Sequence, residues 1–155
     1  MASTERQTDA AGVDAEVEAL AFSTFTHDDA WRLGTIITEL ARERRHPVAI
    51  DIRRGEQQVF HAALEGATAD NDSWVAKKAA AVRRFERSSL ALRLAGEESG
   101  RKLAWLDPAV YAVSGGCVPV TLGGALVGTV AVSGLPDVED HALVVEGIRA
   151  FLGAG

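Results

Sequence analysis

The chain has 155 residues, of which 47% are hydrophobic and 25% are charged, and its formal net charge is −6. These values are typical of one globular domain that is large enough to bury a core, and they disfavour wholesale disorder. No apolar run approaches the roughly 18 residues that a membrane-spanning helix needs. The single cysteine excludes an internal disulfide. We therefore expect a cytoplasmic protein without membrane association.

Charge is distributed unevenly along the chain. Residues 31–102 contain fourteen basic and ten acidic residues, whereas the segments on either side are acidic. A basic middle suits the docking of subunits or the attraction of an anionic ligand, although a mixed-charge surface explains it equally well. No basic stripe carries interleaved aromatic residues, so we expect no nucleic-acid partner.

The first elements differ in clarity. Residues 1–12 lack the pattern of a signal peptide, and we predict a disordered tail there, followed by a single domain at 13–155. Residues 13–21 fit a helix, while Phe22 and Phe25 fit either that helix or a short strand. Thr26 and Asp29 match a capping box, and the apolar spacing after them predicts a helix over about 28–44.

The middle of the chain reads as a hairpin followed by helices. Residues 48–52 and 57–64 are predicted strands joined by a turn. Asn71 or Asp72 can cap a helix over about 73–87, and residues 88–95 continue as a further helix that ends at Gly96. The expected apolar face of the first of these helices consists of Trp74, Ala81, Val82 and Phe85.

The last third of the chain predicts strands that are apolar on both faces. Residues 111–113 are a short strand candidate, and residues 118–122 and 125–132 form a hairpin around a Gly-Gly pair. Asp137 caps a final helix over about 138–152. Because hairpins dominate and both sheet faces need cover, we expect a three-layer α/β/α domain of the α+β type with a largely antiparallel sheet.

Lys78 is the most informative single residue. At 100° per residue it projects from the same side of its helix as Trp74, Val82 and the other apolar residues, while Lys77 points elsewhere. A lysine at such a position extends its ammonium group to solvent, meets a carboxylate, or lies in a pocket as a ligand-binding or interface residue.

Two glycine-containing loops are further candidates. The segment Ser114-Gly115-Gly116-Cys117-Val118-Pro119 precedes a strand, and it either makes a sharp bend or brings backbone N–H groups to an anion. The segment Ser133-Gly134-Leu135-Pro136-Asp137 leads into a helix start, where acidic residues already satisfy the helix dipole. His141 follows in that helix and fits either a surface position or proton transfer.

No catalytic constellation and no metal site is visible. The four histidines are far apart in sequence, and no Cys-x-x-Cys-His occurs for covalent haem attachment. A noncovalent haem needs one axial ligand or none, and His61 on a strand is a candidate ligand. Cys117 begins an apolar strand without a nearby cation, so we expect a buried, unreactive thiol.

Two groups of motifs resemble the GlcG/HbpS-like haem-degrading-domain family. The first is Asp70-Asn71-x-x-Trp74-x-x-Lys77-Lys78 with Val82-x-x-Phe85-x-x-Ser88-Ser89. The second is Gly115-Gly116-x-x-Pro119 with Gly128-x-x-x-Val132-Ser133-Gly134 and then Asp140-His141. Both occur in the family's order, and the likeness spans about residues 22–152.

The resemblance carries expectations about fold, ligand and partners. It implies a profilin-like domain with a five-stranded antiparallel sheet, homo-oligomers built through sheet and helix faces, and haem as a cofactor or ligand. Haem degradation is implied by the family label alone, and a non-catalytic structural or adaptor oligomer is the alternative. Cys117 stands where relatives often carry another glycine. The ligand-binding residues that the motifs imply are Asn71, Trp74, Lys78, Gly115, Gly116, Ser133, Asp140 and His141.

Overall fold

The computed structural model describes residues 9–101 and 103–154. Four strands form one fully antiparallel sheet in the order β2-β1-β4-β3. The strands are β1 (Ala49–Arg54), β2 (Gln57–Ala63), β3 (Cys117–Leu122) and β4 (Ala125–Ser133). Strands β1 and β2 make one hairpin and β3 and β4 the other, as the sequence predicts, and the two hairpins join through β1 and β4.

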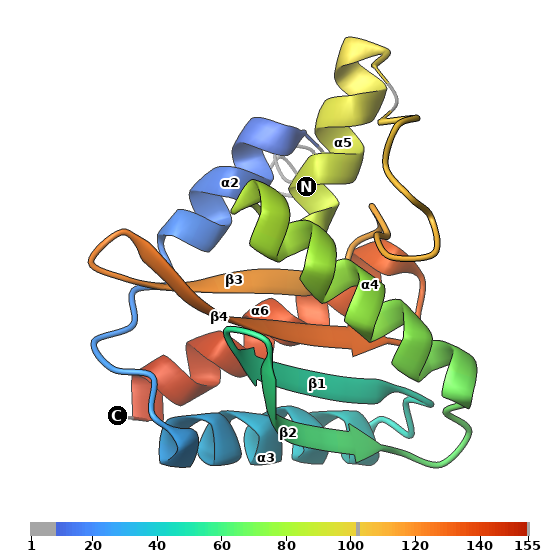
Figure 1. The fold of residues 1–155 in the computed structure, drawn as a ribbon. Coiled ribbons are helices and arrows are strands. Elements are labelled where there is room, and N and C mark those ends of the chain that lie inside the picture. Colours follow the sequence, from blue (N-terminus) through green and yellow to red (C-terminus); the bar gives the residue numbers. More distant parts are fainter. Residues whose placement is uncertain (1–8, 102, 155) are drawn as a thin grey trace, which may run out of the picture.

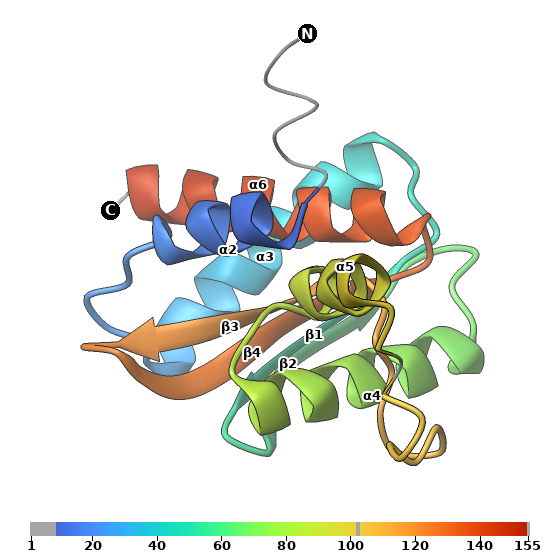
Figure 2. The same cartoon turned by 90° about the horizontal axis from the view of Figure 1, so that it is seen from above.

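Helices cover both faces of this sheet (Figures 1 and 2). Helices α3 (His27–Glu43) and α6 (Asp137–Ala154) pack on one face, and α4 (Ala69–Phe85) crosses the other. Helices α2 (Ala10–Glu18) and α5 (Ser89–Ser99) pack against each other beside β3. The expected three-layer α/β/α arrangement is therefore present.

The two faces of the sheet have different cores. Leu33, Ile37 and Ile148 from α3 and α6 meet the strand residues Ile50 and Val132 in the main apolar cluster, and all of them are fully buried. The face beneath α4 holds only a small cluster of Val75, Ala79, Val82, Cys117 and Ala131. Because small side chains dominate there, the longer polar side chains of α4 have room to reach the sheet.

Helix starts follow the predicted signals in part. Thr26 and Asp29 form the expected capping box at α3, with Asp29 N donating to Thr26 Oγ1 at 3.0 Å. Helix α4 begins at Ala69, earlier than predicted, and Asn71 is not its cap but accepts the Thr68 N–H at 2.9 Å through its side chain. Helix α5 continues through Gly96 and ends at a left-handed Gly100.

Three predictions about the chain's organisation are wrong. The sheet has four strands rather than five, and residues 111–113 are not a strand because the Ala112 N–H donates to Lys77 O of α4 at 3.2 Å instead of pairing with a strand. The predicted tail ends too late, since Asp9 caps α2 and residues 10–12 are helical. Residues 1–8 of that tail lie outside the described residues.

Candidate functional site

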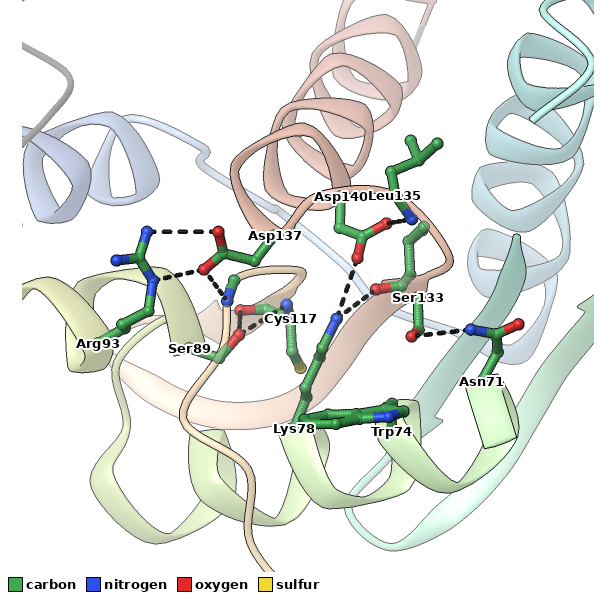
Figure 3. A network of polar contacts seen from close by, with 12 residues as sticks. Asn71, Trp74, Lys78, Ser89, Arg93, Cys117, Ser133, Leu135, Asp137 and Asp140 are labelled. Atoms are coloured by element: carbon green, nitrogen blue, oxygen red, sulfur yellow. Dashed lines mark hydrogen bonds and ion pairs between the residues drawn. The ribbon is translucent and has the colours of Figure 1, made fainter. Parts of the chain in front are cut away.

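A buried ion pair between α4 and α6 lies at the centre of the predicted site (Figure 3). The Lys78 side chain is 2% exposed, and its Nζ donates to Val132 O at 3.0 Å and to Asp140 Oδ2 at 3.2 Å. Of the alternatives for this lysine, the structure shows a carboxylate partner inside a pocket. The pair ties helix α4 to strand β4 and helix α6.

Asp140 is the unusual half of the pair. Its Oδ1 accepts the Leu135 N–H at 3.0 Å. Burial raises the pKa of Asp140 to about 6, although the Lys78 ammonium group and the Leu135 N–H both favour the charged form. Protonation of Asp140 near pH 6 therefore removes the counter-charge of Lys78.

The glycine loop before β3 passes directly against this pair. A Cβ atom on Gly116 would lie 2.7 Å from Lys78 Nζ and 2.5 Å from Val132 O, and its φ of +130° already favours glycine. A Cβ atom on Gly115 would lie 2.5 Å from Asp137 O. Neither position has room for a side chain, because neighbouring atoms come too close to it. At Gly116 the ammonium group of Lys78 fills that space.

Asp137 fixes the same loop from the start of α6. Its Oδ2 accepts the Gly115 N–H at 3.0 Å and the Arg93 Nε–H at 2.5 Å. Burial alone would raise the pKa of Asp137, but the Gly115 N–H and the Arg93 guanidinium overcome it and hold the pKa below its ordinary value. Asp137 therefore stays ionised and keeps α5, the loop and α6 together.

A cavity of about 280 Å³ opens beside the Lys78–Asp140 pair. We call it the Lys78 pocket. On its wall, Asn71 Nδ2 donates a long hydrogen bond to Ser133 Oγ at 3.5 Å. The residues that line it are Asn71, Trp74, Lys78, Ser114, Ser133, Gly134, Leu135, Asp137 and Asp140. Five predicted ligand-binding residues thus share one cavity, and Gly116 contacts Lys78 beside it.

Trp74 lies at the mouth of the pocket rather than in the core. It is 40% exposed, and its Nε1 donates to Asp70 Oδ2 at 3.2 Å. The prediction that Trp74 belongs to the buried face of its helix is therefore wrong. The buried residues of α4 are centred on Val75, Lys78 and Val82, so Trp74 falls at the edge of that face and leaves part of its ring free.

The groups in the pocket are suited to binding rather than to nucleophilic catalysis. The hydroxyl of Ser133, the amide of Asn71 and the ammonium of Lys78 all carry hydrogen-bond donors. Cys117 is fully buried as expected, with its backbone N–H donating to Ser89 Oγ at 3.0 Å. Burial raises the pKa of the Cys117 thiol, which keeps it in the unreactive thiol form.

The two candidate histidines lie elsewhere. His141 follows Asp140 in α6 but points to α2, where its Nε2 lies 2.8 Å from Glu16 Oε1. His61 on the edge strand β2 pairs with Asp72, with 2.6 Å between His61 Nε2 and Asp72 Oδ1. Neither lines the Lys78 pocket. Over residues 9–101 and 103–154, no three His, Cys, Asp or Glu side chains are grouped to hold a metal ion.

Sequence reasoning missed the support that surrounds the pocket. Arg93 holds Asp137, and Ser114 and Leu135 contribute to the lining. The nearest signal was the position of Ser114 and Leu135 inside the two glycine-containing loops. Nothing in the sequence indicated the partner of Arg93, because 44 residues separate it from Asp137.

Fold and site together define a small antiparallel α/β/α domain with a polar pocket at the junction of α4, β4 and α6. The chain belongs to the family described as haem-degrading protein HbpS-like, whose model matches residues 25–149. This confirms the family resemblance seen in the motifs. No helix within the described part of the chain is long and apolar enough to cross a membrane.

Relatives agree with this assignment, and solved structures share the fold. A UPF0303 protein of Streptomyces avermitilis is 51% identical over 148 residues, covering 90% of this chain and 88% of its own. The crystal structure of the Ybr137w protein superposes with a TM-score of 0.86 at 29% identity, covering 97% of this chain and 94% of its own. The PduOC:heme complex has a TM-score of 0.72 at 19% identity, covering 82% and 94%, and shares the fold.

Proposed function

We propose that this protein is a haem-binding domain that holds one carboxylate of the haem in the Lys78 pocket and the ring against Trp74. The observation that carries the proposal is the convergence of Asn71, Lys78 and Ser133 on one cavity with an exposed indole at its mouth. Family membership supports haem as the ligand, as does the haem bound to a protein of the same fold.

The size of the pocket fits one end of such a ligand. Sites that enclose an entire drug-sized molecule have volumes of roughly 300–1,000 Å³, whereas the Lys78 pocket has about 280 Å³. A carboxylate fits it, and the macrocycle would lie outside. Ser133 Oγ and Asn71 Nδ2 are the neutral donors for that carboxylate, and the ammonium of Lys78 supplies positive charge from below.

The carboxylates of the pocket do not prevent this binding. Asp137 is neutralised by Arg93, and Asp140 is paired with Lys78. Because the pKa of Asp140 is raised to about 6, the site becomes more positive as the pH falls from 7 to 5. We therefore expect an anionic ligand to bind more tightly at the lower pH.

Trp74 supplies the aromatic contact. The indole is 40% exposed, and the Lys77 ammonium lies 6.0 Å from the centre of its ring. An offset-stacked aromatic pair contributes about 0.5–1.5 kcal/mol beyond buried area. Neither histidine nor cysteine lines the pocket, so the chain's own residues would hold haem by its edge and face. Haem supplies iron redox chemistry when bound, and haem degradation stays a prediction that rests on the family description.

A hemin titration followed in the Soret band tests the proposal. We expect saturable binding at micromolar hemin, weakened about threefold to tenfold by Trp74→Ala. Trp31→Ala is the matched control, because Trp31 is 64% exposed on α3 and does not line the pocket. Absence of a saturable Soret shift, or equal weakening by the two variants, would remove this site as the haem site.

Ser133→Ala combined with Asn71→Ala tests the carboxylate end without disturbing the buried ion pair. We expect the double variant to weaken hemin binding and to lower the unfolding midpoint slightly, because it also removes the contact of the Asn71 side chain with the Thr68 N–H at the start of α4. Unchanged binding would contradict the role of these two donors.

Self-assembly belongs to the same proposal. We propose a homo-oligomer, supported by large apolar side chains that stay exposed in one copy, among them Trp31 at 64% and Trp105 at 63%. Light scattering with and without hemin measures the mass in solution. A mass of one chain in both conditions would contradict it. A cytoplasmic location stays a prediction from the sequence.

A further inference from the structure

A second cavity, larger than the Lys78 pocket, lies between α5 and residues 100–101 and 103–113. Its volume is about 500 Å³. Figure 1 shows this segment descending beside α5 before it returns to the sheet. Most of the lining is apolar and comes from Leu92, Leu103, Ala104, Leu106, Pro108, Tyr111 and Val113, with Gly96, Gly100 and the charged residues Arg93, Glu97 and Arg101. We call it the α5 cavity.

Local backbone structure holds this cavity open. Gly96 presents no side chain from α5, and a Cβ atom there would meet only Arg101 O at 3.5 Å. Gly100 ends the helix in a left-handed conformation, which turns the chain back along α5. Two turns follow, with Leu106 N donating to Leu103 O and Tyr111 N donating to Asp107 O. The Ala112 N–H then fixes the segment to α4 through Lys77 O.

Tyr111 is held on one wall of the cavity. Its hydroxyl accepts a hydrogen bond from Arg84 Nη1 at 3.0 Å, and the Arg84 guanidinium lies 5.3 Å from the ring centre. Arg84 does not line the cavity. The phenol oxygen therefore accepts a hydrogen bond from α4, and the ring of Tyr111 adds to the apolar lining.

The two arginines that line the α5 cavity differ in whether they have a carboxylate partner. Arg93 is bound to Asp137 at 2.5 Å and to Glu97 at 2.7 Å. Arg101 is exposed and has no carboxylate partner within the described part of the chain. An apolar cavity with an unpaired guanidinium on its lining is complementary to a molecule with an apolar body and one anionic head.

We propose that the α5 cavity is a binding site for an amphipathic carboxylate of the size of a medium-chain fatty acid, with the head group at Arg101. The apolar lining from Leu92 to Val113 takes the chain of the ligand. This site shares no lining residue with the Lys78 pocket, and the proposal does not depend on haem binding.

Calorimetric titration of the full chain with decanoate tests the proposal, with decan-1-ol as the uncharged comparison. We expect decanoate to bind more tightly than decan-1-ol. Arg101→Ala should weaken decanoate about tenfold and leave decan-1-ol unchanged, because only the charge-assisted contact is lost. Arg42→Ala is the matched control, since Arg42 is an exposed arginine on α3 away from the cavity.

Gly96→Leu tests whether the cavity itself is used. The leucine should occupy part of the cavity and weaken the binding of both decanoate and decan-1-ol, while leaving the hemin titration at the Lys78 pocket unchanged. The proposal is overturned if decanoate fails to bind the wild type, if Arg101→Ala and Arg42→Ala behave alike, or if a folded Gly96→Leu variant binds decanoate as the wild type does. If Gly96→Leu does not fold, the comparison of Arg101→Ala with Arg42→Ala decides whether the proposal holds.

Discussion

Asp29 and Asp140 lie in the first turns of α3 and α6, and their pKa values are shifted in opposite directions. Both are buried, at 4% and 2% exposure. Asp29 accepts the Thr26 N–H and the Thr24 hydroxyl, each at 2.8 Å, and also contacts the exposed Arg32. The Thr26 backbone bond, with these side-chain bonds, lowers the pKa of Asp29 to about 2. Burial instead raises the pKa of Asp140 to about 6.

The comparison shows that position on a helix does not decide the charge state of an acid. The helix dipole favours both carboxylates, yet its effect is small beside desolvation. Asp29 accepts hydrogen bonds from Thr24, Thr26 and Arg32, whereas Asp140 is paired with a lysine that is itself buried. Perturbed carboxyl groups in a cavity are candidates for function. The start of α3 is therefore a structural cap, and the start of α6 is where we place the ligand.

Removal of Lys78 should lower the free energy of unfolding more than any other change proposed for these two helix starts. Lys78→Met leaves Asp140 buried without its cation, and breaking one partner of a buried pair costs about 3–5 kcal/mol. Urea denaturation at pH 7 measures the loss. Lys77→Met is the matched control on the same helix and should cost less than about 1 kcal/mol, because Lys77 makes no ion pair in the described structure. Equal effects of the two variants would show that the pair is unimportant.

Gly116→Ala should cause the next largest loss in the free energy of unfolding. Its Cβ atom would lie 2.5 Å from Val132 O and 2.7 Å from Lys78 Nζ, so overpacking of about 1–3 kcal/mol adds to the strain of a φ of +130°. Gly124→Ala carries a positive φ of +83° with nothing within 4 Å of the new atom, and it should lose only about 1 kcal/mol. The difference between their free energies of unfolding reports the crowding around the ion pair. Equal losses for the two variants would contradict crowding around the ion pair.

The pH dependence of stability separates the two aspartates by sign. Native Asp140 binds its proton near pH 6 and the unfolded chain near 3.8, so protonation favours the native state between these values. The free energy of unfolding of the wild type minus that of Asp140→Asn should therefore rise as the pH falls from 7 to 4. For Asp29→Asn the same difference should fall between pH 4 and 2, because native Asp29 has a pKa of about 2. Curves of the same sign would refute the comparison.

The capping contact at α3 should give the smallest effect. Thr26→Ala removes the acceptor of the Asp29 N–H, which costs about 1 kcal/mol. Thr35→Ala is the control within the same helix, because the exposed Thr35 hydroxyl only donates to Trp31 O and alanine favours the helix. Thermal or urea unfolding measures both. A loss from Thr35→Ala as large as that from Thr26→Ala would argue against the cap.

Local signals predicted the elements that local physics controls. The Thr26 cap, the Gly-Gly hairpin between β3 and β4, and the inward projection of Lys78 all follow from spacing within a few residues. The predicted strand at 111–113 failed because a distant carbonyl of α4 takes the Ala112 N–H. The sequence of that segment is apolar and β-branched in part, so nothing local distinguishes the two outcomes.

The site could be predicted in part for the same reason. The motifs placed Asn71, Ser133 and Asp140 together, and the structure groups them around Lys78. His141 was grouped with Asp140 by adjacency in sequence, but neighbours on a helix point about 100° apart, so His141 meets Glu16 on the other side of α6. The α5 cavity had no sequence signal, since it depends on how the segment after Gly100 folds back.

The proposed haem site requires that the Lys78 pocket receive a carboxylate of haem. The most direct measurement is a Soret titration of the wild type with hemin and with hemin whose two carboxylates are methyl esters. We expect saturable binding of hemin and about tenfold weaker binding of the diester, because a charge-assisted contact is lost. Equal affinity for the two compounds would contradict it.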